Sequence, residues 1–453
     1  MPVKNIPSGP KGNPFFGNTM AFGKDPLGFI SKYSQDHGKI VRFKLEKARD
    51  SFLLNTPEHI QYVLMNKGGE FSKGYQQDPI MKLVLGNGLV TSEGSFWLRQ
   101  RRLSQPAFQP RRIADYADTM VEHCERMLAA WKEDDTKDIN AEMMQLAMAI
   151  ATKTLFGLDL HQEDSRDASR SLDTVMSAFN AQITSVYRVV LQQLGLGKLV
   201  PPVNRKLRQA VKNLDDMIYA IIQERRNHPG DRGDLLSMLI STYDEDDGSQ
   251  MTDQQLRDEI ITLFLAGHET TANTLSWAFY LLARHPQAEA ALFTETAQVL
   301  GDRSVTLQDL PYLPYTDHVI KETLRIIPTV WMISRRAEKA VQLDDYHIPA
   351  GSEMIVSQWG MHRNPRYFND PLTFLPERWD NSDDPPSKFV YFPFGGGPRL
   401  CIGERFAMME AALIIATIIR QYRLELVEDH RVEMEPSITL RPKHGIKMKL
   451  RKR

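Results

Sequence analysis

Apolar residues recur at helical spacing over long stretches of the chain, most regularly in its middle. From Leu256 to Leu282 they return every three or four residues and form one broad face. Thr252 and Gln255 precede this stretch in the T-x-x-Q order of a capping box, in which each side chain bonds the backbone of the other residue. No proline follows until Pro286. The pattern predicts a buried helix of about 30 residues, roughly 45–50 Å long, that crosses the whole domain.

The remaining pattern predicts helices through most of the chain and a smaller set of strands. Alternating apolar and polar residues, a charged turn and a second apolar run predict a β-hairpin at 40–45 and 51–55. Helical spacing dominates from about 96 to 325 and returns from 403 to 422. The other predicted elements are a helix at 57–67, a long loop at 72–95, strands at 329–333, 341–348 and 353–357, and a strand pair near 436–450. We therefore expect a mainly α fold of the α+β class, with a large helical body around the long central helix and a small β-rich subdomain.

Composition is typical of soluble globular proteins. Of the 453 residues, 42% are apolar and 25% are charged, which suits a large buried core. The formal net charge is −1, so no global field would attract nucleic acid or an anionic membrane, and any docking has to use a local patch. Residues 1–25 are rich in proline and glycine, and the longest apolar run, 411–419, is too short to span a bilayer. We expect no nucleic-acid partner and no membrane span.

Cysteine usage points to a reducing compartment. Cys124 and Cys401 are the only two cysteines, which is too few for a disulfide framework in so long a chain. Cys124 stands in a helical pattern and is expected only to pack. We expect the protein to be cytoplasmic.

Cys401 ends a glycine-rich turn and stands just before the helical pattern of 403–422. Backbone N–H groups and the helix dipole favour an anion there, so we expect a lowered thiol pKa and a thiolate able to bind metal. The glycines leave room for a flat group to approach the sulfur. Arg399, two residues earlier, can offer a bidentate fork to a carboxylate. The alternative for a single cysteine is a small buried apolar residue.

The order Phe-x-x-Gly-x-Arg-x-Cys-x-Gly, from Phe394 to Gly403, resembles the haem-binding signature of the cytochrome P-450 (haem-thiolate monooxygenase) superfamily. Without a membrane span, the chain is most similar to the soluble bacterial-type members. The resemblance implies that Cys401 is the proximal thiolate ligand of the iron of haem b. It also implies that Arg399 binds a haem propionate, that Phe394 shields the sulfur and that Gly403 lies close to the cofactor.

The middle of the long helix interrupts its own pattern with the residues Ala266-Gly267-His268-Glu269-Thr270-Thr271. Glycine inside a helix costs about 1 kcal/mol relative to alanine. The six residues resemble the oxygen-activation motif of the same family, Ala/Gly-Gly-x-Asp/Glu-Thr-Thr. The resemblance implies that Glu269 and Thr270 are the acid–alcohol pair that relays protons, and that Ala266 lies against the haem. The alternative is close helix packing at a small residue, with Glu269 facing solvent.

Further residues match the family in the same chain order. Trp97 and Arg101, one turn apart on a predicted helix, resemble the Trp-x-x-x-Arg pair that hydrogen-bonds a haem propionate. Arg335 and Lys73 occupy similar propionate-contact places in the family. The resemblance therefore implies a cofactor site assembled from segments far apart in the sequence.

A second group of charges has no part in the chemistry. Glu322 and Arg325 stand three residues apart, as in the family's Glu-x-x-Arg, and Arg378 follows in a Pro-Glu-Arg segment. On their own such charges usually form a surface ion pair that stabilises little. The resemblance implies a buried Arg–Glu–Arg lock of the fold.

The resemblance implies a monooxygenase that inserts one atom of O2 into a substrate, by hydroxylation or epoxidation, and releases the other as water. Electrons would come from NAD(P)H through a separate ferredoxin or flavoprotein reductase, because no Rossmann G-x-G-x-x-G stands in context. We expect residues 1–453 to form a single haem domain without a fused reductase, and to be a monomer. Substrate contacts are expected from mainly apolar positions, which suits a fatty acid, terpenoid or steroid: 84–90, 175–200, 263–266, 329–332 and the turn near Ile438.

Two other functions stay open on the sequence. A haem-thiolate peroxygenase would use H2O2 directly, and a non-catalytic haem sensor would bind the cofactor without forming product. The pair formed by Glu269 and Thr270 favours O2 and external electrons over both alternatives.

Surface charge gives one further hypothesis. The acidic turn at 244–248 is expected to be a solvated loop. Four arginines on predicted helices could form a basic patch that docks an acidic redox partner: Arg99, Arg102, Arg111 and Arg112.

Overall fold

The computed structural model describes residues 5–35, 37–46, 49–73, 79–158, 174–175, 205–380 and 386–453. Its α-helices are α1 (Thr19–Lys24), α2 (Pro26–Gln35), α3 (Pro57–Met65), α4 (Pro79–Leu85), α5 (Gly94–Ser104), α6 (Pro110–Ala114), α7 (Ala117–Ala129), α8 (Ile139–Phe156), α11 (Arg205–Asn227), α12 (Leu235–Ser241), α13 (Asp253–Arg284), α14 (Pro286–Leu300), α15 (Pro314–Ile326), α16 (Gln358–Met361) and α17 (Glu404–Gln421). Its strands are β1 (Ile40–Glu46), β2 (Arg49–Leu54), β3 (Phe71–Ser72), β4 (Thr136–Asp138), β5 (Ile333–Ala337), β6 (Val341–Leu343), β7 (Tyr346–Ile348), β8 (Glu353–Val356), β9 (Tyr422–Leu426), β10 (Met434–Pro436), β11 (Leu440–Pro442) and β12 (Lys447–Lys452). Short 3-10 helices are η2 (Gln105–Phe108), η4 (Leu307–Tyr312), η5 (Pro376–Trp379) and η6 (Gly397–Arg399).

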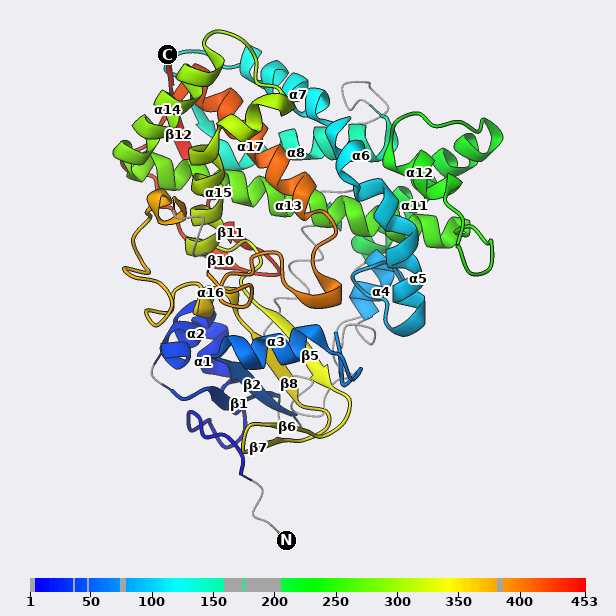
Figure 1. Cartoon of the computed structure of the whole chain (residues 1–453), viewed down its shortest axis with the longest axis vertical. Coiled ribbons are helices and arrows are strands. Elements are labelled where there is room, and N and C mark those ends of the chain that lie inside the picture. The colour runs from blue at the N-terminus through cyan, green and yellow to red at the C-terminus, as the bar shows by residue number, and fades with distance from the viewer. Residues whose placement is uncertain are drawn as a thin grey trace.

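Helix α13 crosses the helical body, as its capping box and apolar spacing predicted (Figure 1). The Thr252 hydroxyl accepts a hydrogen bond from the N–H of Gln255 at 3.3 Å, and the Gln255 side chain accepts one from the N–H of Thr252 at 2.9 Å. Helices α8, α15 and α17 pack around it, which explains why its apolar residues are not confined to one stripe. No helix in the described part of the chain, α13 included, is both long and apolar enough to cross a membrane.

The main sheet has the strand order β1-β2-β8-β5-β3 and lies at the N-terminal end of the molecule (Figure 1). β1 and β2 form the predicted antiparallel hairpin, with Ile40 opposite Leu54. β8 joins β2 in parallel, and β5 joins β8 in antiparallel orientation. The sheet therefore ties the start of the chain to the segment that follows α15.

Two strand predictions have wrong bounds. The strand predicted at 329–333 is instead β5, which begins at the last of those residues. The carbonyl oxygen of Thr329 accepts a hydrogen bond from the N–H of Leu440 at 2.8 Å, so this segment lies against the C-terminal hairpin and not in the sheet. The strand predicted at 341–348 is a hairpin of β6 and β7, which turns at Asp344 with φ of 50°.

Two elements were missed, and both depend on distant contacts. The loop predicted at 72–95 contains α4, whose Ile80 and Val84 are buried in a core that includes residues of α13. One or two turns of helix are too short to show a clear period. β4 lies within the stretch of 96–325 that was predicted to be helical, and it pairs with β12, near the other end of the chain. The strand pair predicted near 436–450 is observed as β10 with β11, while β12 pairs with β9.

The predicted basic patch is largely paired within the chain. Arg99 and Arg102 bind the carboxylate of Asp244 at 2.8 and 2.6 Å, and Arg112 binds Asp231 at 2.5 Å. Asp244 is buried, so the expectation of a wholly solvated acidic turn is wrong. These ion pairs join α5 and α6 to the loops on either side of α12, and they lower the positive charge that this surface can offer to a partner.

Glu322 and Arg325 are completely buried and form the predicted charged group with Arg378. Arg325 donates from Nε and Nη2 to the two carboxylate oxygens of Glu322, both at 2.8 Å. Arg378 Nε donates to Glu322 at 3.4 Å. The rest of the Arg325 guanidinium donates to backbone carbonyls of the long segment after β8, at His362, Pro371 and Thr373. The group therefore joins α15 to the connection that leads towards Cys401.

Candidate functional site

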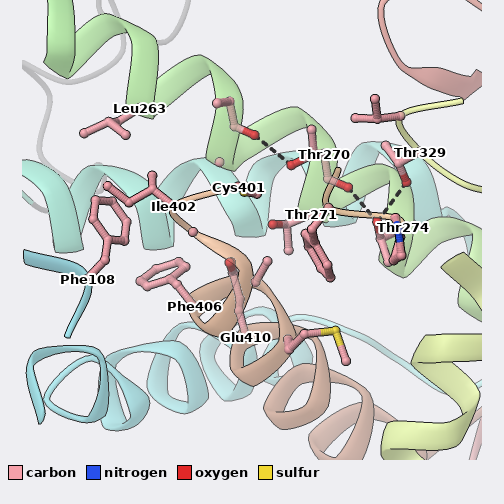
Figure 2. Close-up of a pocket in the computed structure, with 18 of the residues that line it drawn as sticks. Phe108, Leu263, Thr270, Thr271, Thr274, Thr329, Cys401, Ile402, Phe406 and Glu410 are labelled. Atoms are coloured by element: carbon pink, nitrogen blue, oxygen red, sulfur yellow. Dashed lines mark hydrogen bonds between the residues drawn. The ribbon is translucent and has the colours of Figure 1, made fainter. Parts of the chain in front are cut away.

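A cavity of about 420 Å³ separates the middle of α13 from the loop that carries Cys401 (Figure 2). The predicted site residues that line it are Ala266, Thr270, Arg335, Phe394, Arg399, Cys401 and Gly403. Three further predicted residues lie next to this lining: Trp97 and Lys73 are beside Arg399, and Arg101 bonds Leu400. Glu269 is instead bonded to Thr439. The structure thus brings most of the predicted residues to one place.

The backbone around Cys401 is shaped so that the sulfur faces the cavity. The N–H of Cys401 donates to the carbonyl oxygen of Phe394 at 3.0 Å and closes the glycine-rich turn. Gly395 and Gly397 have φ of 78° and 70°, in the left-handed region that favours glycine. A Cβ on Gly397 would lie 2.2 Å from the carbonyl oxygen of Leu64, so a larger residue would displace α3. The turn leads directly into α17.

Cys401 opens onto the cavity but is otherwise surrounded by protein, and burial raises the pKa of its thiol. The N–H groups of Gly403 and Glu404, at the start of α17, and the charge of Arg101 act in the opposite direction. The expectation of a lowered thiol pKa is therefore wrong, because desolvation outweighs the helix terminus. A thiolate at this position needs a cation beside it, which a metal ion bound to the sulfur supplies.

Three cationic side chains, Lys73, Arg335 and Arg399, form what we call the cation cluster at one edge of the cavity. Arg335 and Arg399 line the cavity, and Lys73 is buried next to them. Burial, and after it the charge of Arg399, lower the pKa of Lys73 to about 7. Lys73 Nζ donates to the carbonyl oxygen of Leu89 at 2.7 Å. The Arg399 guanidinium lies 4.0 Å from the centre of the Trp97 ring, so Trp97 belongs to the same edge.

Two further charged residues lie next to the sulfur loop and the cation cluster: Arg101 and Glu93. Arg101 Nη1 donates to the carbonyl oxygen of Leu400 at 2.9 Å, beside the sulfur loop. Glu93 accepts hydrogen bonds from the Arg399 side chain and from the N–H of Lys73. The sequence analysis missed Glu93, because an acid just before a helix is commonly explained by local effects at the helix start.

On the opposite wall, α13 presents a row of hydroxyl groups (Figure 2). Thr270 Oγ1 donates to the carbonyl oxygen of Ala266 at 2.7 Å, and Thr274 Oγ1 donates to that of Thr270 at 2.9 Å. The hydroxyl of Thr274 also lies 2.8 Å from that of Thr329. Such bonds to the preceding turn loosen a helix locally. Because Ala266 and Gly267 are small, a flat group can lie close to this wall.

Glu269 does not touch the cavity together with Thr270 in the described structure. Its carboxylate accepts a hydrogen bond from the Thr439 hydroxyl at 2.5 Å, in the turn between β10 and β11. Glu269 is buried, so the alternative in which it faces solvent is wrong. The neighbouring His268 is also buried, with Nε2 3.0 Å from the carbonyl oxygen of Met144. Burial lowers the pKa of His268 to about 4, so this imidazole is neutral at pH 7.

Glu410 is a candidate functional residue that the sequence analysis missed. It lines the cavity from α17 and is hydrogen-bonded to Thr271 of α13 (Figure 2). Burial raises the pKa of Glu410 to about 8, although the bond with Thr271 acts against this shift. The carboxyl group is therefore mostly protonated at pH 7. Its sequence signal was an isolated acid inside the apolar run of 403–422.

These features together fit an iron porphyrin. The sulfur of Cys401 could ligate the iron, small residues leave room on the opposite wall, and the cation cluster could pair with the carboxylates of the ring. The rest of the lining is largely apolar and suits a hydrocarbon ring. Within the described ranges, no group of three or more His, Cys, Asp or Glu residues could hold a metal ion. A metal at this single sulfur therefore needs further ligands, which porphyrin nitrogens provide.

A family model described as Cytochrome P450 matches residues 7–450. The chain belongs to the cytochrome P450 family. Cyclooctatin synthase of Streptomyces melanosporofaciens is 35% identical over 434 residues, which cover 95% of this P450 and 92% of that protein. Cyclooctat-9-en-7-ol 5-monooxygenase of the same organism is 35% identical over 422 residues, with 91% and 88% covered. Pentalenene oxygenase of Streptomyces avermitilis is 32% identical over 435 residues, with 95% and 92% covered.

Solved P450 structures share the fold along the whole chain. The cytochrome P450DA heme domain has a TM-score of 0.87 at 23% identity and covers 100% of this P450 and 98% of that chain. Retinoic acid bound cyanobacterial CYP120A1 has a TM-score of 0.85 at 25% identity and covers 100% of both chains. The predicted mainly α fold of the α+β class, with the P450 arrangement, is confirmed.

Family membership also establishes the class of reaction. The chain is a cytochrome P450 monooxygenase, and membership of this family implies a haem cofactor. The resemblance noted at the sulfur loop and in the middle of α13 is thereby confirmed for the family. What each residue contributes follows from its position around the cavity.

Proposed function

We propose that this P450, with haem b bound to Cys401, hydroxylates or epoxidises a terpenoid or a similarly apolar small molecule. The observation that carries the proposal is the position of Cys401, which faces the Ala266–Thr270 stretch of α13 across a largely apolar cavity. The names of three relatives, which refer to cyclooctatin, cyclooctat-9-en-7-ol and pentalenene, support a terpenoid substrate.

In this proposal the sulfur loop and the cation cluster hold the cofactor. Cys401 ligates the iron, and the cluster pairs with the two propionates together with Trp97 and Arg101. Phe394 and Gly403 flank the sulfur, and a Cβ on Gly403 would lie 4.0 Å from it. Haem, when bound, supplies the activation of O2, for which a thiolate ligand favours cleavage of the O–O bond. The protein orients the ring, compensates its charges and excludes water.

Thr270 is proposed to deliver protons at the wall that faces the sulfur. Its hydroxyl lines the cavity and already donates to Ala266, so its oxygen can accept a proton or a hydrogen bond from a second donor. Glu269 is the acid we assign to the pair, and it would serve Thr270 once it releases the Thr439 hydroxyl. Glu410 is mostly protonated at pH 7 and is hydrogen-bonded to Thr271, the residue after Thr270, so it is available as a second proton donor.

Thr270→Ala is expected to uncouple electron use from product formation. Without the hydroxyl, Thr270 would no longer control proton delivery at this wall, so peroxide should be released and product per NADPH should fall by about tenfold or more. The measurement is product, peroxide and NADPH consumed in the same reaction, with a reductase supplied. Thr270→Ser keeps the hydroxyl and should retain coupling, and Thr274→Ala removes a hydroxyl one turn away. Unchanged coupling in Thr270→Ala would contradict the assignment.

The substrate is expected to bind against the apolar part of the lining. Positions predicted from the sequence that line the cavity are Val90, Leu263, Ala266 and Thr329. Val330, from the same predicted range as Thr329, also lines the cavity, and so does Ile333, which was not predicted. Ile438 packs beside this region. Of the predicted positions at 175–200, only Val175 is among the described residues. A terpenoid library, screened for the change of spin state that follows displacement of iron-bound water, tests the substrate class against fatty acids and steroids.

Electrons are proposed to come from a separate ferredoxin or flavoprotein reductase to a monomeric haem domain of residues 1–453. The P450 match over residues 7–450 supports a single domain. Two cysteines without a disulfide support the proposed cytoplasmic location. Turnover with NADPH and a reductase, compared with turnover by H2O2 alone, separates this proposal from a peroxygenase. Absence of product with every oxidant would favour a haem sensor.

A further inference from the structure

Glu93 places a carboxylate inside the cation cluster. Its Oε1 accepts a hydrogen bond from the N–H of Lys73 at 2.6 Å, and its Oε2 accepts one from Arg399 Nη2. The side chains of Glu93 and Arg399 are each only 15% exposed. Glu93 is the N-cap residue of α5, yet its side chain caps none of that helix's N–H groups. The side chain is therefore oriented by the cluster and not by its own helix.

The bidentate fork expected of Arg399 is used within the protein. Nη2 donates to Glu93, and Nη1 donates to the carbonyl oxygen of Ser92 at 3.2 Å. The same guanidinium lies over the Trp97 ring. The bonds at Nη1 and Nη2 and the contact of one face with Trp97 fix the position of the guanidinium. Only its remaining N–H groups can therefore bind a propionate. Glu93 thus determines how Arg399 is presented at the edge of the cavity.

Glu93 is the carboxylate that offsets part of the positive charge of the cation cluster. Arg399 and Arg335 both line the cavity, and Lys73 is buried beside them, so like charges lie close together. The same two arginines lower the pKa of Lys73, which Glu93 opposes. Glu93 therefore places a negative charge among the side chains that would pair with the two propionates of haem b. Among the described residues, Arg101 bonds none of these three side chains directly: it donates to the carbonyl oxygen of Leu400, and its positive charge lies near the Cys401 sulfur.

Glu259, the other acid near Lys73, connects structural elements and is not part of the cation cluster. Glu259 is completely buried and accepts hydrogen bonds from the N–H of Leu89 at 3.0 Å and from Gln100 at 3.1 Å. Burial raises its pKa to about 7, so it carries a full charge only at higher pH. Glu259 therefore fastens the loop before α5 to α13, and Glu93 is the carboxylate that bonds the cluster directly.

We propose that Glu93 is a positioning residue that holds Arg399 against Trp97 and lowers the positive charge that the cation cluster presents to the two propionates. The inference rests on the proposed haem site. The negative charge of Glu93 repels the propionates of haem, whereas its hydrogen bond orients Arg399, which would bind them. Its negative charge and its hydrogen bonds consequently act in opposite directions on the retention of haem.

The test compares haem release from the holoenzyme to excess apomyoglobin, followed by absorbance. Glu93→Gln keeps an acceptor for Arg399 but removes the charge, so haem should leave about fivefold more slowly than from the wild type. Glu93→Ala also loses the hydrogen bonds and should release haem faster than Glu93→Gln. Glu338→Gln is the matched control, since Glu338 bonds Ser72 beside Lys73 without joining the cluster, and should match the wild type.

Reconstitution with the dimethyl ester of haem b, which lacks propionate charges, separates the charge effect from any structural one. With this ester, Glu93→Gln should release the cofactor at the wild-type rate. Faster or unchanged release of ordinary haem from Glu93→Gln, or equal slowing with the ester, would overturn the inference. Failure of the haem site itself is recognised earlier, because the wild type would then lack the thiolate-type spectrum with carbon monoxide.

Discussion

Cys401→Ala is expected to abolish the Soret band that a thiolate-ligated ferrous haem gives with carbon monoxide, and with it all monooxygenase turnover. The sulfur is the cavity-lining atom that the turn from Phe394 presents to the opposite wall. Alanine leaves no ligand in the sulfur loop, because the other residues of this loop that line the cavity are apolar or cationic. Any haem retained by the cation cluster should therefore show the spectrum of a different or missing axial ligand. Absorbance of the reduced, CO-treated protein makes the measurement.

Cys124→Ala is the matched control for this result. Cys124 is fully buried in α7, where burial raises the pKa of its thiol, and it packs in the main core. Removing its sulfur should leave the CO spectrum unchanged and cost only a small cavity, of the order of 1 kcal/mol. A normal band in Cys401→Ala, or a lost band in Cys124→Ala, would show that the iron is not held as we propose.

Arg325→Ala is expected to leave little folded, haem-loaded protein. Arg325 is completely buried and neutralises Glu322, which also accepts hydrogen bonds from Trp379 at 3.0 Å and from the N–H of Leu375 at 3.0 Å. Removing the guanidinium leaves a buried carboxylate without its main partner, which costs about 3–5 kcal/mol. Stabilities of whole proteins are only about 5–15 kcal/mol. Yield of soluble protein, haem content and urea unfolding are the measurements.

Arg303→Ala provides the comparison with an exposed ion pair. Arg303 bonds Asp309 at 2.6 Å from a side chain that is 51% exposed. Its loss should lower the free energy of unfolding far less than the loss of Arg325, because the Arg303 side chain is half exposed and Asp309 keeps its hydrogen bonds from Thr306. Equal yield and equal unfolding free energy for Arg325→Ala and Arg303→Ala would remove the Glu322 group from any role in stabilising the fold.

Local chemistry explains which parts of this P450 could be predicted from the sequence. The capping box of Thr252 and Gln255 needs only residues three apart, and it is observed as predicted. The turn before Cys401 depends on glycines at positive φ within a few residues. Glu322 and Arg325 are neighbours on one helical face, so their spacing already indicated a pair. In each case the partners lie within one or two turns of backbone.

The contacts that could not be predicted join residues that lie far apart in the sequence. Glu269 bonds Thr439, Glu93 bonds Arg399, and Asp244 bonds Arg102, each across a hundred residues or more of sequence. Such contacts depend on how helices and loops are packed, and an acid with a distant partner looks in the sequence like any solvated acid. Burial has the same origin, which is why the pKa of the Cys401 thiol was predicted in the wrong direction.

By itself, the sequence determined the long central helix, the mainly α fold and the sulfur loop, because spacing, caps and glycines act through neighbouring backbone. Only the tertiary structure decided which charges face one another: that Thr270 lines the cavity while Glu269 turns to Thr439, and that Glu93 stands among the cations. The physical reason is that electrostatic and desolvation energies depend on distance in space and on exclusion of water, and neither quantity can be read from order along the chain.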